Sequence, residues 1–378
     1  MDALATPLPK DWEIKTFRDI STINQGLQIP ISQRLKAPTE HAKFYITIQA
    51  LNNRKEFEYI KTYNESVVCH KDDILMTRTG NTGMVITNIE GVFHNNFFKI
   101  NFDRTLINKD FLVYFLSLEQ TQKTILKKAG TSTIPDLNHN DFYSLSIPLP
   151  PLNEQIAIAN ILSDVDRYLY SLDALILKKE SVKKALSFEL LSQRKRLKGF
   201  NQNWQRVRLG DICEITTGSL DANEMVHYGK YRFYTCAKEY YFIDKYAFDT
   251  EAILISGNGA YVGYVHYYKG KFNAYQRTYV LDNFSEHIMF VKYFLTMFLQ
   301  SHIQTNRNEG NTPYIVMATL KDFEIFLPPL NEQIAIANIL SDLDNEIISL
   351  KNKKRQFENI KKALNHDLMS AKIRVLKK

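Results

Sequence analysis

The sequence predicts an α+β protein in which two similar globular domains alternate with two long helices. The helices are expected to pair as an antiparallel coiled coil, with an approximate two-fold relation between the halves. The segment LPPLNEQIAIANILSDVD at 149–166 returns at 327–344 as LPPLNEQIAIANILSDLD, with 17 of 18 positions identical. Each copy opens a stretch that contains no Pro or Gly, 153–198 and 331–378. Such stretches favour long helices, and the diverged sequence between them favours two separate globules.

The composition is that of an ordinary globular protein. A chain of 378 residues with 44% hydrophobic residues is long enough for two or three cores. No apolar run reaches the 18 or so residues that a membrane span needs, and the N-terminus lacks the pattern of a signal peptide. The three cysteines, Cys69, Cys213 and Cys236, form no C-x-x-C pair. We therefore expect a cytoplasmic protein without disulfides or a zinc site.

The net charge of +7 is located in the two helical stretches. Residues 153–198 carry nine Lys/Arg and six Asp/Glu, and residues 331–378 carry ten and six, so the rest of the chain sums to zero. The two stretches hold only four of the 46 aromatic residues. The simplest interpretation is that the excess charge keeps a helix face solvated. The globules are aromatic and neutral.

The apolar residues of both stretches follow the alternating three- and four-residue spacing of a heptad. Seven of nine seam positions are apolar in each copy, which is typical of a coiled coil over about four heptads. A helix of about 46 residues is roughly 69 Å long and cannot bury such a seam alone. The expected partner is the other helix, and packing of each helix on its own globule is the alternative. The seam positions are Leu162, Val165, Leu169, Leu172, Ile176, Lys179, Lys183, Leu186 and Leu190, and Leu340, Leu343, Ile347, Leu350, Lys354, Phe357, Lys361, Leu364 and Leu368.

The globular parts repeat more faintly. Trp12 matches Trp204, DILMTRTGNTGMV at 73–85 matches AILISGNGAYVGYV at 252–265, and GTSTIPDL at 130–137 matches GNTPYIVM at 310–317. The expected organisation is a first globule at 1–150, a helix at 151–198 that Gly199 ends, a second globule at 199–327 and a second helix at 328–378.

No catalytic constellation is found in the sequence. There is no G-x-x-x-x-G-K-[ST], and Gly257 and Gly259 are followed by Val262 where a dinucleotide-binding motif needs glycine. Asn/Asp-Pro-Pro-Tyr/Phe, the motif expected of an amino-methyltransferase, is absent, and the nine histidines show no metal-ligand spacing. We expect that the chain is not an enzyme by itself and holds no metal.

The repeated Pro-Pro-Leu-x-Glu-Gln segment, each time followed by a coiled-coil helix, resembles the specificity subunit of type I restriction-modification systems. LPKDWEIKTFRDI and FNQNWQRVRLGDI resemble the openings of that family's domains. GTSTIPDLNHNDFYSLSIPLPPLNEQ resembles the way its domains run into the helix. The resemblance covers the whole chain, although the second globule is shorter than the first, so some of its recognition loops are expected to be short.

The resemblance implies a function in DNA recognition. The two globules would be target recognition domains that each read one half of a bipartite site in double-stranded DNA, and the helices would set the gap. Two copies of an adenine methyltransferase subunit that uses S-adenosylmethionine would dock on the chain. Motor-nuclease subunits that use ATP and Mg²⁺ would join them to direct restriction. The chain itself would bind no cofactor.

The resemblance also gives a reason for the near-identity of the two helix starts. Two identical partners would need two similar surfaces, although a recent duplication or recombination would produce the same repeat. The expected docking residues for the methyltransferase subunits are Asn153, Glu154, Gln155, Asn331, Glu332 and Gln333.

Base readout needs side chains that donate and accept hydrogen bonds, such as Arg for guanine and Asn or Gln for adenine. Such residues gather at Gly-rich turns of both globules, although turns favour Asn, Thr and Gly in any case. The expected DNA-binding residues of the first globule are Asn24, Gln25, Arg78, Asn81, Thr82, His94, Asn95, Asn96, Thr131, Ser132 and Thr133. Those of the second are Asn258, Tyr261, Gln276, Arg277, Asn311, Thr312 and Tyr314.

Two other functions compete with DNA recognition. A coiled-coil scaffold or adaptor without DNA binding explains the helices but not the polar loops. A specificity module separated from a fused methyltransferase-nuclease explains the loops, but the two-fold repeat favours a whole subunit.

Overall fold

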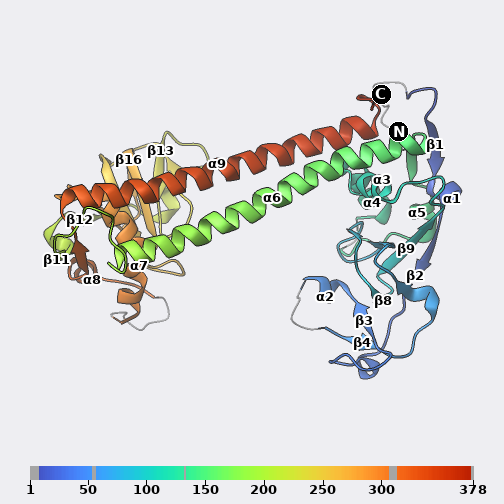
Figure 1. Cartoon of the computed structure of the whole chain (residues 1–378), viewed down its shortest axis with the longest axis horizontal. Helices are drawn as coiled ribbons and strands as arrows, with labels where there is room; N and C mark the ends of the chain where they lie inside the picture. The colour runs from blue at the N-terminus through green and yellow to red at the C-terminus, as the bar shows by residue number, and fades with distance from the viewer. Residues whose placement is uncertain (1–7, 53–56, 132, 306–312, 376–378) are drawn as a thin grey trace. The chain divides into compact units, whose positions relative to one another are not determined.

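The chain folds into two compact units, each described here by itself. The computed structural model describes residues 8–52, 57–131, 133–305 and 313–375. Unit 1 comprises Met1–Leu172 and Lys353–Lys378, and unit 2 comprises Asp173–Asn352. The long helices α6 (Leu152–Leu191) and α9 (Leu330–Met369) each contribute one part to either unit (Figure 1). Each unit therefore combines one globule with a segment of both helices.

The globule of unit 1 contains two four-stranded sheets and a short antiparallel ribbon. The sheet orders are β2-β9-β6-β7 and β4-β3-β8-β5, and β1 pairs with β10, the strand that leads into α6. The strands are β1 (Glu13–Thr16), β2 (Ser21–Gln25), β3 (Lys43–Ile46), β4 (Tyr59–Ile60), β5 (Val68–Cys69), β6 (Ile74–Thr77), β7 (Val85–Ile86), β8 (Gly91–Phe93), β9 (Phe97–Phe102) and β10 (Ser146–Leu149). The helices are α1 (Phe17–Ile20), α2 (Ile48–Asn52), α3 (Lys109–Leu116), α4 (Glu119–Ala129) and α5 (His139–Tyr143).

Unit 2 repeats this plan with one six-stranded sheet, in the order β12-β17-β15-β16-β13-β14. Its ribbon pairs β11 with β18, which leads into α9. The strands are β11 (Gln205–Arg208), β12 (Glu214–Thr217), β13 (Tyr231–Tyr234), β14 (Tyr241–Ile243), β15 (Phe248–Ser256), β16 (Val265–Ala274), β17 (Thr278–Asp282) and β18 (Glu324–Leu327). The helices are α7 (Ile288–Thr305) and α8 (Met317–Lys321).

The sheets differ because the segments of unit 1 that correspond to β15 and β16 of unit 2 are each divided into two short strands. Strands β15 and β16 form one continuous hairpin, whereas β5 and β6 are separated by a turn in which the His70 amide donates to the Asp73 carboxylate, 2.8 Å away. Strands β7 and β8 are separated around Asn88, whose φ of 57° lies in the left-handed region. The two breaks divide one sheet into two, and the second sheet of unit 1 gains its own core around Tyr45, Val68 and Phe93.

The two long helices pair with antiparallel directions inside each unit, as the heptad pattern predicts. In unit 1, Asp166 binds Lys361 at 2.5 Å and the rings of Tyr168 and Phe357 are 4.6 Å apart. In unit 2, Lys179 binds Glu346 at 2.7 Å and Lys183 binds Asp344. All 18 predicted seam positions are buried or half-buried. The lysines in the seam have acidic partners on the facing helix in these pairs, so polar contacts help to specify the register.

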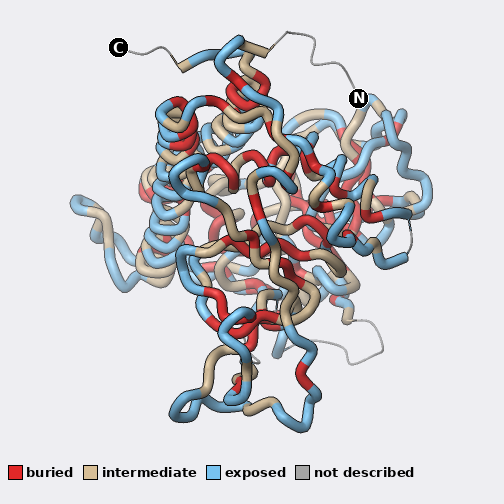
Figure 2. The backbone as a smooth tube through the Cα atoms, turned by 90° about the vertical axis from the view of Figure 1, so that its right-hand side faces the viewer, coloured by how far each residue is buried: buried red, intermediate tan, exposed pale blue. Residues whose placement is uncertain are grey.

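Each long helix also packs on a globule at its start, α6 in unit 1 and α9 in unit 2. Ile158, Ala159 and Leu162 join Phe111 and other residues of α3 in the core of unit 1. In unit 2, Ile336, Ala337 and Leu340 enter the equivalent core. The coiled coil and the alternative of packing on the globule therefore each describe part of the helices. Figure 2 shows that buried backbone concentrates in the interior, whereas connecting loops are largely exposed.

The helices end earlier than the sequence indicates. Helix α6 stops at Leu191, and not at Gly199, because Gln193 adopts a φ of 63°. Helix α9 stops at Met369 in the same way, with a φ of 56° at Ala371. After each turn the chain folds back, so that the Lys195 amide donates to the Glu189 carbonyl at 3.0 Å. This return brings an arginine, Arg196 or Arg374, to the start of the other helix.

Each returning arginine forms an ion pair with the buried glutamate of the repeated segment. Arg374 binds Glu154 in unit 1 and Arg196 binds Glu332 in unit 2, each with a closest distance of 2.7 Å. The Trp12 indole donates to Glu154 at 3.1 Å, and Arg196 lies 5.7 Å from the Trp204 ring centroid. The side chain of Glu332 is only 1% exposed. We call each group of glutamate, arginine and tryptophan a clasp, because it joins the start of one helix, the end of the other and the globule.

We expect Arg196→Ala to destabilise the protein strongly, because it leaves the Glu332 carboxylate buried without its counter-ion. Breaking a buried pair in this way costs about 3–5 kcal/mol of unfolding free energy. The control is Lys195→Ala, which removes an exposed pair with Glu189, 3.8 Å apart, worth at most about 1 kcal/mol. Urea unfolding of both variants measures the difference. Equal unfolding free energies for the two variants would show that the clasp does not hold unit 2 together.

Candidate nucleic-acid interface

Four of the predicted loops meet at one end of the first sheet of unit 1. The Arg78 amide donates to the Asn96 carbonyl at 2.7 Å, and the Leu137 amide donates to the Arg78 carbonyl at 2.8 Å. The Thr82 hydroxyl donates to the Pro135 carbonyl at 2.6 Å. These bonds bring together residues that are far apart in the sequence. We call loops 25–28, 78–83, 94–96 and 133–137 the loop face of unit 1.

The guanidinium of Arg78 is already engaged within the loop face. Its Nη2 lies 2.7 Å from Asp136, the group stacks over the Phe98 ring at 5.7 Å, and the side chain is 18% exposed. Its Nε is buried and makes no hydrogen bond to the described residues. Arg78 therefore ties two loops together in the free chain, and a contact with guanine would require the Asp136 pair to rearrange.

The remaining predicted residues of this face form a polar network. Gln25 donates to the Asn95 carbonyl at 3.3 Å, and the Asn95 amide group donates to Gln28 at 3.3 Å. The Asn96 amide donates to Nδ1 of His94 at 3.1 Å. Burial, together with the charge of Arg34, lowers the pKa of His94. The imidazole is therefore neutral at neutral pH, with its proton on Nε2.

Some predicted residues lie away from this face. Asn24 lies within β2, where its side chain accepts a hydrogen bond of 2.7 Å from Asn101, so it belongs to the sheet. Thr131 and Thr133 are exposed beside the face, and Asn81 is exposed at its turn with a φ of 59°. Ser132, Asn311 and Thr312 lie outside the described residues.

Unit 2 builds an equivalent loop face with different side chains. The Gly257 amide donates to the Arg277 carbonyl at 2.8 Å, and the Ile315 amide donates to the Gly257 carbonyl at 2.9 Å. An isolated bridge joins Asn258 to Tyr314, as another joins Thr79 to Asp136 in unit 1. We call loops 218–220, 257–263, 275–277 and 313–316 the loop face of unit 2. It gathers the predicted residues Asn258, Tyr261, Gln276, Arg277 and Tyr314.

One glycine in each unit allows these loops to approach closely. A Cβ at Gly26 would stand 2.2 Å from the Phe93 carbonyl oxygen, and one at Gly218 would stand 1.9 Å from that of Ala274. No side chain fits at these distances, so both positions require glycine. The shared requirement shows that the two loop faces have the same backbone plan.

Two further groups lie beside the loop faces, and neither is among the residues predicted from the sequence. In unit 1 the short helix α2 carries Gln49 and Asn52, both exposed. In unit 2 the guanidinium of Arg232 lies 4.2 Å from the Tyr240 ring centroid and 4.5 Å from that of Tyr268. Lys238 lies 5.1 Å from the centroid of Tyr261. The tyrosine-rich run at 231–242 could have marked the second group, but α2 is too short for a periodic pattern.

The helix starts form a second candidate site, and the structure gives four of its predicted residues another role. Glu154 and Glu332 are held in the clasps. Gln155 donates to the carbonyls of Leu106 and Pro150 at 2.9 and 2.8 Å, and Gln333 donates to Glu286 and Pro328 at 2.6 and 2.8 Å. These four side chains are buried and bonded within the chain, so the expectation that they touch a partner is revised. Asn153 and Asn331 remain exposed.

An exposed stripe continues from each of these asparagines. On α6 it consists of Asn153, Ile156, Asn160 and Asp164, and on α9 it consists of Asn331, Ile334, Asn338 and Asp342. The spacing of three and four residues places each set on one helix face. The two stripes carry the same four residue types. Their described contacts within the chain are local: Asn153 and Asn331 each accept a hydrogen bond from the amide of the next residue, and Asp164 pairs with Arg167.

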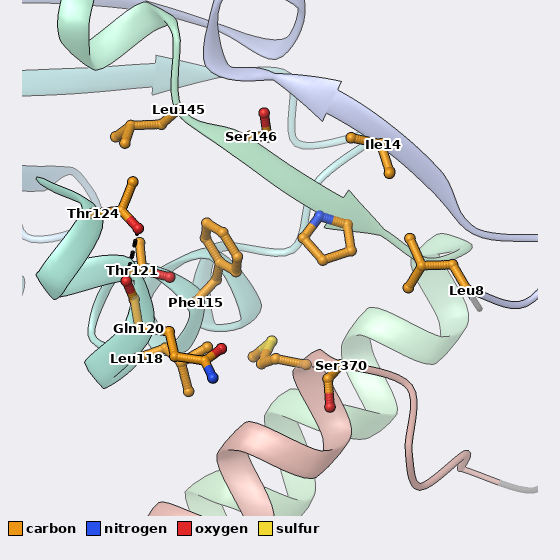
Figure 3. A pocket seen from close by; sticks show the side chains of 12 residues that line it. Leu8, Ile14, Phe115, Leu118, Gln120, Thr121, Thr124, Leu145, Ser146 and Ser370 are labelled. Atoms are coloured by element: carbon orange, nitrogen blue, oxygen red, sulfur yellow. Dashed lines mark hydrogen bonds between the residues drawn. The ribbon is translucent and has the colours of Figure 1, made fainter. Parts of the chain in front are cut away.

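Unit 1 also has an apolar pocket of about 230 Å³ between β10, α4 and the end of α9 (Figure 3). Its lining includes Ile14, Phe115, Leu145, Pro148 and Met369. Thr124 and Gln120 line it as well, and their bond of 2.9 Å closes a helix turn. The accessible surface of the lining is mainly apolar, so the pocket does not suit base readout.

The described residues contain no group of three or more His, Cys, Asp or Glu side chains that could hold a metal ion. Among the same residues, no helix is long and apolar enough to cross a membrane.

Comparisons with known proteins agree on one family. Residues 9–179 and again 201–359 match the family described as type I restriction modification DNA specificity domain. The EcoDI specificity subunit of Escherichia coli is 37% identical over 171 residues, which are 44% of this chain and 37% of that protein. The MjaVIII specificity subunit of Methanocaldococcus jannaschii is 25% identical over 97% of this chain and 94% of its own length.

Solved structures share the fold. The S subunit of a type I restriction-modification system from M. genitalium superimposes with a TM-score of 0.64 at 19% identity, covering 96% of this chain and 98% of that one. A chain from a structure of complex assembly and conformational transition in the type I R-M system gives 0.58 at 16% identity, covering 96% and 99%. The likeness supports two α+β domains with two long helices.

Proposed function

The chain belongs to the family of type I restriction-modification DNA specificity domains and contains two such domains, and we propose that each unit reads one half of a bipartite DNA site. The observation that carries this proposal is the pair of loop faces. They share one backbone plan, down to the glycines at 26 and 218, yet they present different side chains. A common frame with different reading groups is what recognition of two different half-sites needs. A scaffold without DNA binding would have no use for it.

The side chains of both faces suit readout of bases. Unit 1 presents Gln25, Asn81, Asn95 and Asn96 together with Arg78, and unit 2 presents Asn258, Gln276, Arg277 and tyrosines. Carboxamides can pair with adenine and arginine with guanine in the major groove. Backbone amides, threonines and lysines nearby supply phosphate contacts that position the duplex. We assign the target recognition domains to 1–150 and 199–327, and the connecting helices to 151–198 and 328–378.

The chemistry belongs to partner subunits in this proposal. A specificity subunit is a non-catalytic component, so the chain directs adenine methylation and restriction without performing either. Two methyltransferase subunits would bring S-adenosylmethionine, and the motor-nuclease subunits would use ATP and Mg²⁺. The complex would act on DNA in the cytoplasm.

The two exposed stripes are the surfaces that fit two copies of the methyltransferase subunit. Asn153 and Asn331 begin them, and Ile156 and Ile334 give each an apolar centre that is 42% and 39% exposed. Identical partners require equivalent surfaces. In this proposal the buried residues next to them have an indirect role. They hold the first turn of each helix against the globule: Glu154 and Gln155 in α6, and Glu332 and Gln333 in α9.

Sequencing of methylated adenines in host DNA tests the function directly. Cells with this chain and its partner subunits should carry a bipartite methylated motif that disappears when the chain is removed. Within that motif, we expect Arg78→Ala to relax one base of one half, because an Arg–guanine pair contributes about 1–3 kcal/mol of discrimination.

Asp136→Ala is the matched control, because it breaks the same loop tie but leaves the guanidinium free for a base. The motif should persist in this variant. Equal effects of the two substitutions would mean that Arg78 only joins the loops, and an unchanged motif at unchanged efficiency in Arg78→Ala would exclude it from readout.

Charged substitutions in the stripes test the docking surfaces. Ile156→Asp with Ile334→Asp should reduce binding of the methyltransferase subunit more than either change alone, because each removes an apolar contact and adds a charge that must be desolvated. Native mass spectrometry gives the stoichiometry.

The control pair, Leu177→Asp with Ile348→Asp, changes exposed apolar residues of the same helices outside the repeat, 64% and 55% exposed. Two bound copies on the Ile156/Ile334 double variant would place the docking surface elsewhere.

The helices are expected to set the gap between the half-sites, because α6 and α9 each run through both units. Half-site centres on one face of the duplex lie about 10–11 bp apart. Four residues added after Ile176 lengthen α6 by about 6 Å, or roughly two base pairs at 3.4 Å each. Lys179 and Glu346 pair beyond that point, so α9 needs the same insertion after Leu350 to keep its register.

We expect the paired insertion to lengthen the gap by one or two base pairs while both half-sites stay unchanged. Methylated-adenine sequencing reads the gap and the half-sites together. Changed half-site bases at a constant gap would contradict the role of the helices as a spacer.

A further inference from the structure

Unit 1 has a second, polar hollow beside its loop face. Its volume is about 550 Å³, and it is lined by Arg34, residues 47–49, Asn52, His94 and Asn96. Two of these residues, His94 and Asn96, belong to the loop face already described. The others come from α2 and from the end of a 3-10 turn, and sequence patterns did not single them out.

Backbone and capping bonds fix α2 at this place. The Thr47 hydroxyl accepts a hydrogen bond from the Ala50 amide at 3.0 Å, and the His94 amide donates to the Ile46 carbonyl at 3.0 Å. The Ile48 side chain lies beside Gly80, where an added Cβ would stand 3.1 Å from its Cδ1. The hollow therefore adjoins loops 78–83 and 94–96.

The described residues that line the hollow offer mainly uncharged hydrogen-bonding groups. Among them, the cation Arg34 is bonded to Glu58 at 2.9 Å and to the Ile29 carbonyl at 2.9 Å. Gln49, Asn52 and Asn96 contribute carboxamides, and the neutral His94 has its Nε2 proton left for donation. A phosphate offers only acceptors and is contacted by cations, hydroxyls, carboxamides and backbone amides, whereas the paired donor and acceptor of a carboxamide match a base edge. The chemistry favours a base.

We propose that this hollow receives the edge of an adenine·thymine pair in the half-site of unit 1, with Gln49 and Asn52 as specificity-determining residues. The inference rests on the proposed function and adds a named base class to one half-site. A carboxamide side chain can donate to N7 and accept from N6 of adenine, which no other base presents in that order. Both residues are exposed, so their amide groups can reach a ligand.

Unit 2 has a different structure at the equivalent position. The segment 235–240 after β13 contains no helix and carries Lys238 and Tyr240, which pack with the aromatic and cationic groups Tyr261 and Arg232. The carboxamide hollow is therefore a property of unit 1, and changes in it should affect only one half of the motif.

The test is the double variant Gln49→Ala/Asn52→Ala in the complete complex, read by methylated-adenine sequencing. We expect one A·T position in one half-site to lose roughly 5- to 150-fold discrimination, and the other half and the gap to stay unchanged. The control is Gln356→Ala/Asn359→Ala, which removes the same two residue types from an exposed face of α9 in unit 1 and should leave the motif intact.

A single variant, Gln49→Glu, keeps the size of the side chain and serves if the double variant is less stable. It replaces the amide donor by a second acceptor, so the preference at that position should shift toward cytosine. An unchanged motif in both variants, or relaxation at a G·C position, overturns the inference. A changed motif in Arg78→Ala or Arg277→Ala would then still support the proposed function. An unchanged motif in all of these variants would overturn both the inference about the hollow and the proposed function.

Discussion

The ion pair between a buried glutamate at the start of one helix and a partly exposed arginine beyond the end of the other is the contact on which each unit depends. The pair of Glu154 with Arg374 joins residues 220 positions apart in unit 1, and the pair of Glu332 with Arg196 joins residues 136 positions apart in unit 2. Burial of a carboxylate is costly without a counter-ion, so the helix start, the returning chain and the tryptophan of the globule must be in place together. The lysine–acid pairs along the helices then specify which residues face each other.

The repeated segment contains buried residues that contact the rest of the chain and exposed residues that face away from it. Glu154, Gln155, Ile158, Ala159 and Leu162 are buried, so packing and the clasp account for their identity with the second copy. Asn153, Ile156, Asn160 and Asp164 are exposed, as are Asn331, Ile334, Asn338 and Asp342. Among the described contacts of these side chains, only the hydrogen bond of each asparagine to the next amide recurs in both copies. The proposed partner that binds twice would account for this exposed identity, although a recent duplication or recombination would produce the same repeat. The loop faces were free to diverge because they share only a backbone plan.

Much of this structure could be predicted from local pattern. The heptad seam, the antiparallel pairing and the two α+β globules could be predicted from the hydrophobic period and from the repeat. The Gly-rich turns predicted several loops that the structure brings together. Contacts between distant residues could not be predicted in this way. Examples are the pair of Arg78 with Asp136, the clasps and the placement of Asn24 inside a strand. The end of α6 at Leu191 depended on a left-handed Gln193, for which the sequence offered no glycine, and α2 is too short to show a period.

The charges of the loop faces explain why such a chain would depend on its partners. Non-specific affinity for DNA comes mainly from cations that displace counter-ions from phosphates. In this chain the net positive charge lies in the helical stretches, and two arginines near the loop face of unit 1 are paired internally, Arg34 with Glu58 and Arg78 with Asp136. The loop face of unit 1 therefore provides hydrogen bonds for discrimination more than electrostatic attraction. In the proposed complex the methyltransferase subunits supply that attraction, so that base selection and affinity reside in different chains.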